Sequence, residues 1–143
     1  MIKLEEFLPY RLSVLANQVS QGIARTYSER FGLSIPEWRV IAILGRFDHI
    51  PASAVAERSA MDKVAVSRAV RQLLDLGLIR RRDGREDRRA KPLTLTAAGR
   101  RVYEAIAPAA LDFEARLLAA LTPTERRSLD RILTKLVQAS TES

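Results

Sequence analysis

Residues 61–95 read MDKVAVSRAVRQLLDLGLIRRRDGREDRRAKPLTL, and the pattern in this stretch decides the fold. It predicts a helix that ends at a glycine, followed by a strand, a charged loop and a second strand. Asp62 can cap a helix that begins at Lys63, because its carboxylate can accept the unpaired N–H groups of the first turn. Gly77 can end that helix, because glycine adopts the left-handed conformation at little steric cost. Between them, apolar residues recur at spacings of three and four and predict one buried stripe: Val66, Val70, Leu73 and Leu74.

The opposite face of this predicted helix is polar and cationic. It carries Ser67, Arg68 and Arg71, with Lys63 at its N-terminal end. A helix about 10–12 Å across fits the major groove of B-DNA, which is roughly 12 Å wide. Arginine can make paired hydrogen bonds to guanine in that groove, and serine can contact a base or a phosphate. The sequence therefore predicts a DNA recognition helix whose contacts come from these four residues.

Two short strands are predicted after the helix, at residues 78–82 and 91–95, with Leu93 and Leu95 directed inward. Pro92 cannot donate a ladder hydrogen bond and therefore favours an edge strand. The loop between the strands is rich in arginine: Arg85, Arg88 and Arg89. Such side chains are attracted by the negative potential of a narrow minor groove. The strand pair is therefore predicted to be a DNA-binding wing, whose arginines contact the minor groove or the phosphates.

The order of these motifs resembles the MarR (multiple antibiotic resistance regulator) family of bacterial transcription factors. Residues 62–81 match D-K-x-x-V-S-R-x-V-x-x-L-x-x-x-G-L-I-x-R, and residues 83–99 match D-x-R-x-D-R-R-A-K-x-L-x-L-T-x-x-G. The flanking helices also fall where the family has them. The resemblance implies a mainly α (α+β) fold: a winged helix-turn-helix lobe at 34–96, with dimerisation helices at 1–33 and 97–143, in a single MarR-type domain over 1–143.

The resemblance also implies roles for residues outside the DNA face. The place of Asp87 in the D-R-R motif implies that it pairs with an arginine and holds the shape of the wing. The family has a ligand cavity between the DNA lobe and the dimer helices, where Tyr10, Arg11, Asn17 and Trp38 are expected. An arginine beside an apolar face can pair with the carboxylate of an aromatic effector. Two alternatives remain open, a surface salt bridge for Arg11 and core packing for Trp38.

Three helices are predicted before the recognition helix: residues 5–31, 36–46 and 51–58. The first is read as one long helix with an apolar face: Leu8, Leu12, Leu15, Val19, Ile23, Tyr27 and Phe31. Ser34 and Glu37 have the S-x-x-E spacing of a capping box, which opens the second helix. A turn at 59–61 joins the third helix to the recognition helix, as in a helix-turn-helix motif.

Two helices are predicted after the wing: residues 97–120 and residues 123–139. Thr96 can cap the first of them, and Pro108 inside it predicts a kink. Thr122 and Glu125 form a second capping box, which opens the last helix. The apolar stripes of these terminal helices must be covered, and a two-fold interface covers both copies at once. We therefore expect a homodimer; packing within one chain is the alternative.

Length and charge agree with a DNA-binding protein. The chain has 143 residues, which suits one domain, and its formal net charge is +7. Residues 58–91 hold 11 lysines and arginines against 5 acidic residues, whereas the rest of the chain holds 13 basic and 12 acidic residues. The excess positive charge is therefore concentrated on the predicted DNA face, which indicates an anionic polymer as the partner.

Composition argues against several other classes of protein. The chain has no cysteine and one histidine, too few soft ligands for a structural zinc site, so we expect no metal and no cofactor. It shows neither a catalytic triad nor a glycine-rich phosphate loop, so we expect no enzyme. No run approaches 18 apolar residues, so we expect no membrane partner and a cytoplasmic location.

These observations predict a dimeric, DNA-binding transcriptional regulator. We expect it to repress a promoter by binding a pseudo-palindromic operator in double-stranded DNA, and to be released by a small aromatic or acidic effector. A ligand-independent architectural DNA-binding protein is the alternative, since it would have a similar basic surface. Competition with unrelated DNA distinguishes the two, because an architectural protein has little sequence preference.

Overall fold

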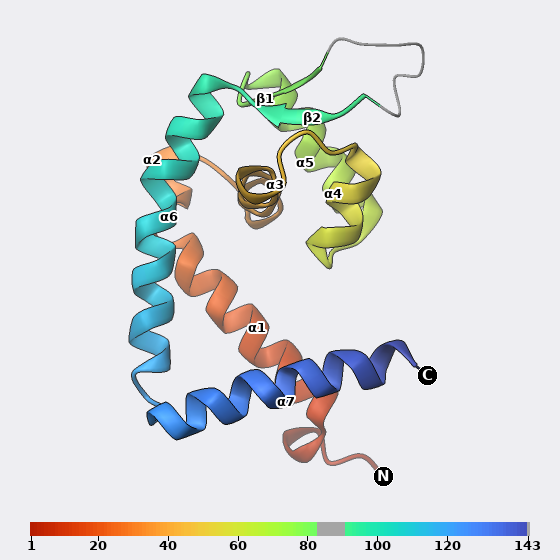
Figure 1. Ribbon diagram of the computed structural model, residues 1–143, viewed down its shortest axis with the longest axis vertical. Helices are drawn as coiled ribbons and strands as arrows, with labels where there is room; N and C mark the ends of the chain where they lie inside the picture. The colour runs from red at the N-terminus through yellow and green to blue at the C-terminus, as the bar shows by residue number, and fades with distance from the viewer. Residues whose placement is uncertain (83–90, 143) are drawn as a thin grey trace. The chain divides into compact units, whose positions relative to one another are not determined.

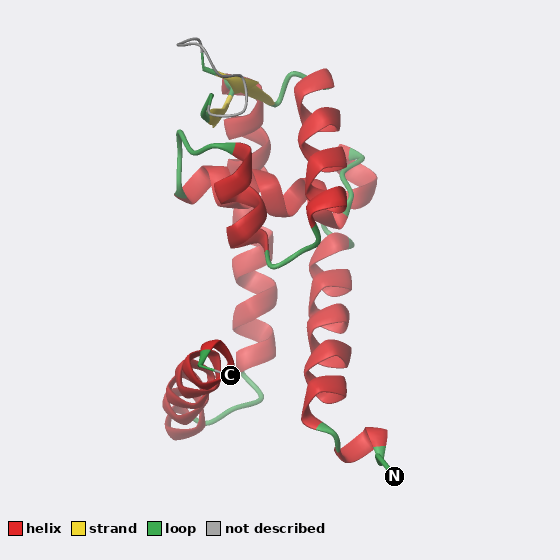
Figure 2. Cartoon of the chain, turned by 90° about the vertical axis from the view of Figure 1, so that its right-hand side faces the viewer, coloured by secondary structure: helices red, strands yellow, loops and turns green. Residues whose placement is uncertain are grey.

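The computed structural model describes residues 1–82 and 91–142, and the chain that it describes is mostly helical (Figures 1 and 2). Its elements in chain order are η1 (Leu4–Glu6), α1 (Leu8–Ala24), α2 (Ser28–Phe31), α3 (Ile35–Arg46), α4 (Ala52–Ser59), α5 (Lys63–Asp75), β1 (Ile79–Arg81), β2 (Leu93–Leu95), α6 (Ala97–Leu118) and α7 (Pro123–Thr141). The chain divides into two compact units, Met1–Ala110 and Leu111–Ser143. No helix in the described ranges is long and apolar enough to cross a membrane. The predicted fold class, mainly α with a small strand pair, is confirmed.

The prediction of one long helix over residues 5–31 is wrong at both ends. Helix α1 begins only at Leu8, because Pro9 lies in its first turn. A helix that included Glu5 would bring the proline ring against the Glu5 carbonyl and would lack the hydrogen bond to it. At the other end the helix stops after Ala24, where the Thr26 hydroxyl donates to the Ile23 carbonyl at 2.6 Å. The chain then places Tyr27 in the core, with 1% of its surface exposed.

The core of the first unit is built around α3, which packs against α4, α5 and β2 (Figure 1). The predicted capping box is present, since the Ser34 hydroxyl accepts from the Glu37 N–H and the Glu37 carboxylate accepts from the Ser34 N–H. The buried residues of α3 are Val40, Ile41 and Leu44. Trp38 and Ala42 of the same helix are only partly buried.

Helix α5 follows its prediction closely. The Asp62 carboxylate accepts a hydrogen bond from the Ala65 N–H at 2.8 Å and caps the helix. Three of the four stripe residues are buried, with Leu73 fully buried and Val66 and Val70 at most 4% exposed, whereas Leu74 is only partly buried. Ala69 is buried as well, which the prediction omitted. Gly77 has the predicted left-handed backbone, with a φ of 72°.

The two strands form an antiparallel pair, shorter than predicted, in which Ile79 lies opposite Leu95 and Arg81 opposite Leu93. Leu93 and Leu95 are buried as predicted, but Thr94 between them is also buried, with 4% of its surface exposed. The loop at 83–90 lies outside the described residues.

Close packing fixes the strand pair against the start of α6. A Cβ atom on Gly99 would lie 1.9 Å from the Leu78 carbonyl oxygen, so only glycine fits at this position. The Thr96 hydroxyl accepts from the Gly99 N–H at 3.0 Å and donates to the Gly77 carbonyl at 2.7 Å. Thr96 therefore caps α6 as predicted, and it also ties α6 to the end of α5.

In the second unit, α7 begins with the predicted capping box of Thr122 and Glu125. None of the described residues of this helix is buried. Its apolar residues are 37% to 64% exposed: Leu129, Ile132, Leu133, Leu136 and Val137. Helix α6 runs through Pro108, and the kink expected there stays a prediction.

Candidate nucleic-acid interface

The outer face of α5 presents all four of the residues predicted to read the major groove. Lys63, Ser67, Arg68 and Arg71 are exposed on the face opposite to the buried stripe. Together with Val64 they line one shallow hollow of about 280 Å³. The structure thus brings the predicted set together on one exposed face of α5. That these residues contact DNA remains a prediction.

A larger groove of about 820 Å³ runs between α4 and α5 and extends to β1. Three cationic side chains line it, Lys63, Arg71 and Arg81, together with the carboxylates of Glu57 and Asp75. Arg81 was not among the predicted DNA contacts, although it belongs to the run of three arginines at 80–82. A strand residue that shares a groove with the recognition helix can be found only from the fold.

The turn between α4 and α5 is held by hydrogen bonds of Ser59, which is 2% exposed. Its hydroxyl donates to the Ala56 carbonyl at 2.7 Å and accepts from the Met61 N–H at 3.1 Å. Ala60 has a left-handed backbone, with a φ of 56°, which redirects the chain into α5. These bonds hold the turn from which α5 begins.

Arg39 connects this turn to the N-terminal helix. One nitrogen of its guanidinium donates to the Ser59 carbonyl at 3.3 Å, and the other donates to the Ser20 hydroxyl on α1 at 3.3 Å. Sequence reasoning missed Arg39, because its two partners lie 19 and 20 residues away along the chain. The side chain provides a direct polar contact between α1 and the helix-turn-helix.

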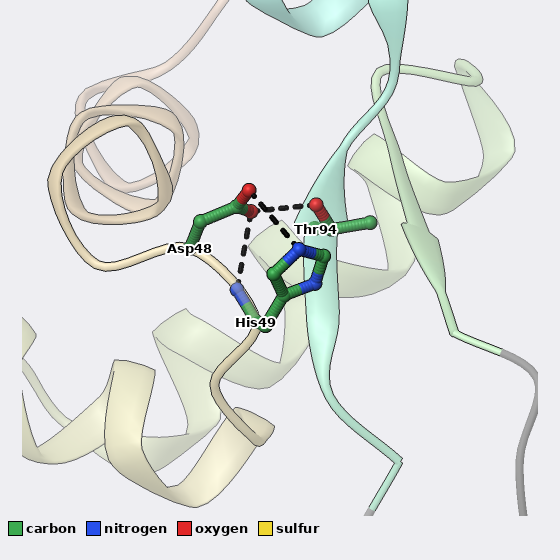
Figure 3. Close-up of polar contacts among 3 residues, drawn as sticks. All are labelled: Asp48, His49 and Thr94. Carbon is green, nitrogen blue, oxygen red and sulfur yellow. Dashed lines mark hydrogen bonds and ion pairs between the residues drawn. The ribbon is translucent and has the colours of Figure 1, made fainter.

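The base of the wing is attached to the connection between α3 and α4 (Figure 3). The Thr94 hydroxyl donates to Asp48 Oδ1 at 2.5 Å, and the Leu93 N–H donates to the Ile50 carbonyl at 2.8 Å. The His49 N–H also donates to Asp48 Oδ1, at 3.1 Å, and its Nε2 lies 3.4 Å from Asp48 Oδ2. Strand β2 is therefore held from both sides, by β1 and by this connection.

The surroundings of Asp48 alter the acidity of its carboxyl. Partial burial acts to raise the pKa of Asp48, but the hydrogen bond from Thr94 and the positive charges of His49 and Arg100 outweigh it. The pKa of Asp48 is consequently lowered from its usual value of 3.8. The ionised form is thus the one that the fold favours.

The residues predicted for the wing tip, Arg85, Asp87, Arg88 and Arg89, lie outside the described residues. At the described end of the wing, Arg80, Arg81 and Arg82 are exposed. Three arginines of the chain are therefore exposed on β1 and directly after it.

The four residues predicted for a ligand site have different environments. Tyr10, Arg11 and Asn17 are exposed on α1. Trp38 is partly buried between two aromatic rings, with centroid distances of 5.7 Å to Tyr27 and 6.1 Å to Tyr103. None of the four lines the groove between α4 and α5. The contacts of Trp38 are those of a packed core residue, which was the open alternative for it.

Burial in the aromatic cluster around Trp38 changes the pKa of the Tyr27 phenol. Burial raises the pKa of Tyr27 to about 12, although the nearby charge of Arg39 acts in the opposite direction. Tyr27 is therefore neutral at any physiological pH. Within residues 1–82 and 91–142, no cluster of three or more potential metal ligands is present.

Known proteins resemble this chain in both sequence and structure. A profile described as the MarR family matches residues 31–90. The HTH-type transcriptional repressor Rv2887 of Mycobacterium tuberculosis is 29% identical over 131 residues, which are 91% of this chain and 91% of that protein.

Solved structures agree with the sequence matches. The MarR/EmrR family transcriptional regulator from Acinetobacter sp. ADP1 superimposes with a TM-score of 0.89 at 27% identity, over 99% of this chain and 100% of that chain. The structure of Rv2887 in complex with salicylic acid has a TM-score of 0.70 at 26% identity, over 91% of this chain and 96% of that chain.

Proposed function

We propose that this chain, which is similar to MarR family regulators in its residues 31–90 and to the repressor Rv2887 over 91% of its length, is a dimeric repressor that binds a pseudo-palindromic operator and is released by a small aromatic or acidic ligand. The observation that carries the proposal is the outer face of α5. There, Lys63, Arg68 and Arg71 are exposed together on a helix whose opposite face is buried in the core.

In the proposed complex, α5 lies in the major groove. Arg68 and Arg71 donate to base edges or phosphates, Ser67 contacts a base or a phosphate, and Lys63 neutralises a phosphate near the start of the helix. The wing arginines Arg85, Arg88 and Arg89 contribute minor-groove or phosphate contacts, and Asp87 holds the shape of the wing. Arg81 adds a further cation beside the recognition helix.

The proposed dimer uses the terminal helices, residues 1–33 and 97–143, and leaves residues 34–96 as the DNA-binding lobe. Apolar side chains at the start of α1 and along α7 are exposed in the single chain, as Leu15 at 52% and Ile132 at 47% illustrate. A two-fold interface covers such stripes in both copies at once. Two recognition helices related by a two-fold axis read inverted half-sites, which is why the operator is expected to be pseudo-palindromic.

The proposed ligand is a small aromatic acid. Rv2887 has been solved in complex with salicylic acid and with p-aminosalicylic acid. On this chain, Arg11 is the proposed partner of the ligand carboxylate, with Tyr10, Asn17 and Trp38 as further ligand contacts. The contact of Arg39 with both α1 and the turn before α5 supports a connection between such a site and the recognition helix.

The proposal places the protein in the cytoplasm, where bacterial DNA is bound, and gives it no catalytic role. It is tested by selecting sequences from a random double-stranded DNA library and measuring affinity for the selected duplex against unrelated DNA. A repressor enriches an inverted repeat and prefers it by about 10³-fold or more at physiological salt. Equal affinity for both duplexes would contradict the proposal and favour an architectural protein. Added salicylate should then lower the affinity for the selected duplex.

A further inference from the structure

Val64 is an apolar residue on the cationic face of α5. It is 61% exposed, although its neighbours in the hollow on the outer face are polar or charged. With Ser67, Arg68 and Arg71 it follows the spacing i, i+3, i+4, i+7, which places the four side chains on one face of the helix. Val64 is therefore part of the surface that the proposed function directs into the major groove.

The fold itself gives little reason for valine at this position. On a helix with 100° between residues, Val64 points away from the buried Leu73, so it adds nothing to the core. A β-branched residue is also a weaker helix former than alanine. Single exposed apolar residues are common on protein surfaces, but this one lies among the side chains that are placed to read DNA.

We propose that Val64 recognises the 5-methyl group of a thymine; this inference rests on the proposed function. The N-terminal residues of a recognition helix contact base edges, and Val64 is the second residue of α5. The thymine methyl is the apolar group that a base pair exposes in the major groove, and apolar side chains contact it. A methyl-to-methyl contact needs no hydrogen bond, so valine is well suited to it.

The position of Val64 also predicts where the thymine lies. Val64 and Arg68 are one helical turn apart, about 5.4 Å along the axis. Successive base pairs are separated by about 3.4 Å. The thymine should therefore lie within about two base pairs of the base that Arg68 contacts. Each half-site would then contain one base that is hydrogen-bonded by Arg68 and one thymine whose methyl contacts Val64. The two contacts together are more selective than an arginine contact alone.

The test uses the duplex selected from the random library and replaces its thymines by uracil, one at a time. Uracil keeps every hydrogen-bonding group of thymine and lacks only the methyl, so each replacement removes one apolar contact. For the parent protein we expect one thymine in each half-site at which uracil weakens binding about fourfold, the value for one buried methylene-sized group. In Val64→Ala the same replacement should have no effect, and the other thymines should behave as in the parent.

Leu76→Ala is the matched control, because Leu76 is a 50% exposed apolar residue at the opposite end of the same helix. It should keep the uracil sensitivity of the parent. Uracil penalties that are the same in Val64→Ala and in the parent at every thymine would overturn the inference. If the parent enriches no sequence at all, the proposed function fails and takes the inference with it, so the two failures are distinguishable.

Discussion

Helices α5 and α7 have the same amphipathic pattern, but only α5 has its apolar face covered. Its stripe residues Val66, Val70 and Leu73 are at most 4% exposed, whereas Leu133 and Val137 of α7 are 46% and 64% exposed. The periodicity of a sequence thus shows that a face will be covered without showing what covers it. For α5 the cover is the rest of its own lobe; for α7 we propose a second copy of the chain.

Helix α1 shows both conditions along its own length. In its first half, Leu8, Leu12 and Leu15 are 43% to 52% exposed. Toward its end, Gly22 is buried, and Ile23 is partly buried against the core. The end of α1 therefore packs against the core of the first unit, whereas its first half carries apolar side chains that are exposed in the single chain and that we propose a second copy covers.

The largest predicted effect comes from breaking the covered stripe. Leu73→Ala should lower the free energy of unfolding by about 2–5 kcal/mol, because it removes a fully buried side chain and leaves a cavity. Urea denaturation measures the change. Leu76→Ala, at the 50% exposed residue that directly follows this helix, should cost far less. Equal losses in the two variants would show that burial does not distinguish the faces of α5.

The uncovered stripe of α7 should matter for association. Leu133→Ala removes a side chain that is 46% exposed in the single chain. Full burial of a leucine contributes about 1.5–3 kcal/mol, and about half of that surface is still exposed in the single chain. Because the variant loses this contact in both copies of a two-fold dimer, we expect the dimer to be weakened by about 1.5–3 kcal/mol. Sedimentation over a range of protein concentrations measures the dissociation constant. A parent protein that is monomeric at micromolar concentration would remove the proposed dimer altogether.

Most of the fold could be predicted from the sequence because its signals are local. The caps at Ser34, Asp62 and Thr122 and the stop at Gly77 depend on residues a few positions away, and all four are present. The break between α1 and α2 could not be predicted in this way. Tyr27 continues the apolar spacing of α1, but its burial against Trp38 on α3 removes it from the helix.

In the candidate site, too, some residues could be predicted from local sequence and others only from the fold. The four residues on the outer face of α5 share one element, so helical spacing alone groups them. Arg81 reaches the same groove from a strand, and Arg39 connects elements about 20 residues apart, so neither could be assigned before the fold was known. Val64 was visible in the sequence, but its significance depends on being exposed among cations.

The outer face of α5 is expected to be uncovered until DNA covers it. Arg68→Ala should weaken binding to the selected duplex by about 1–3 kcal/mol if Arg68 reads a guanine, and should scarcely change binding to random DNA. Fluorescence anisotropy with both duplexes measures the two affinities. Arg101→Ala, an exposed arginine on α6, is the control and should leave both affinities near those of the parent. Equal losses on the two duplexes would make Arg68 a phosphate contact.

The exposed half of α1 provides a test of the ligand proposal. If Arg11 pairs with a carboxylate, Arg11→Ala should raise the salicylate concentration needed for half-release of DNA by about tenfold or more, since a charged hydrogen bond contributes about 1.5–3 kcal/mol. Affinity for the duplex without salicylate should stay near that of the parent. Arg25→Ala, an exposed arginine just beyond the end of α1, is the matched control. An unchanged release curve for Arg11→Ala would exclude Arg11 as the carboxylate partner.

The smallest predicted effect concerns the polar contact that joins the wing to the covered lobe. The pKa of Asp48 is lowered in the folded protein, so the ionised carboxylate stabilises the fold. This stabilisation is fully present above the unfolded pKa, about 3.8, and is lost as the pH falls through the lower folded value. Asp48→Asn should therefore be less stable than the parent at pH 7, by less than about 1 kcal/mol because the Asp48 side chain is 39% exposed.

Urea denaturation at pH 7 and at pH 3 separates this effect of charge from a general loss of packing. The difference between the parent and Asp48→Asn should shrink at pH 3, because the parent carboxyl is then taking up its proton. Thr94→Val removes the hydroxyl that donates to Asp48. At pH 7 the double variant should therefore lose less stability than the sum of the losses in the two single variants. Asp112→Asn is the control, since its carboxylate is 68% exposed and pairs only with Arg116 among the described residues. The two proteins could instead differ in free energy of unfolding by the same amount at both pH values. The charge of Asp48 would then not hold β2 in place, and the attachment of the wing would rest on the backbone hydrogen bond between Leu93 and Ile50.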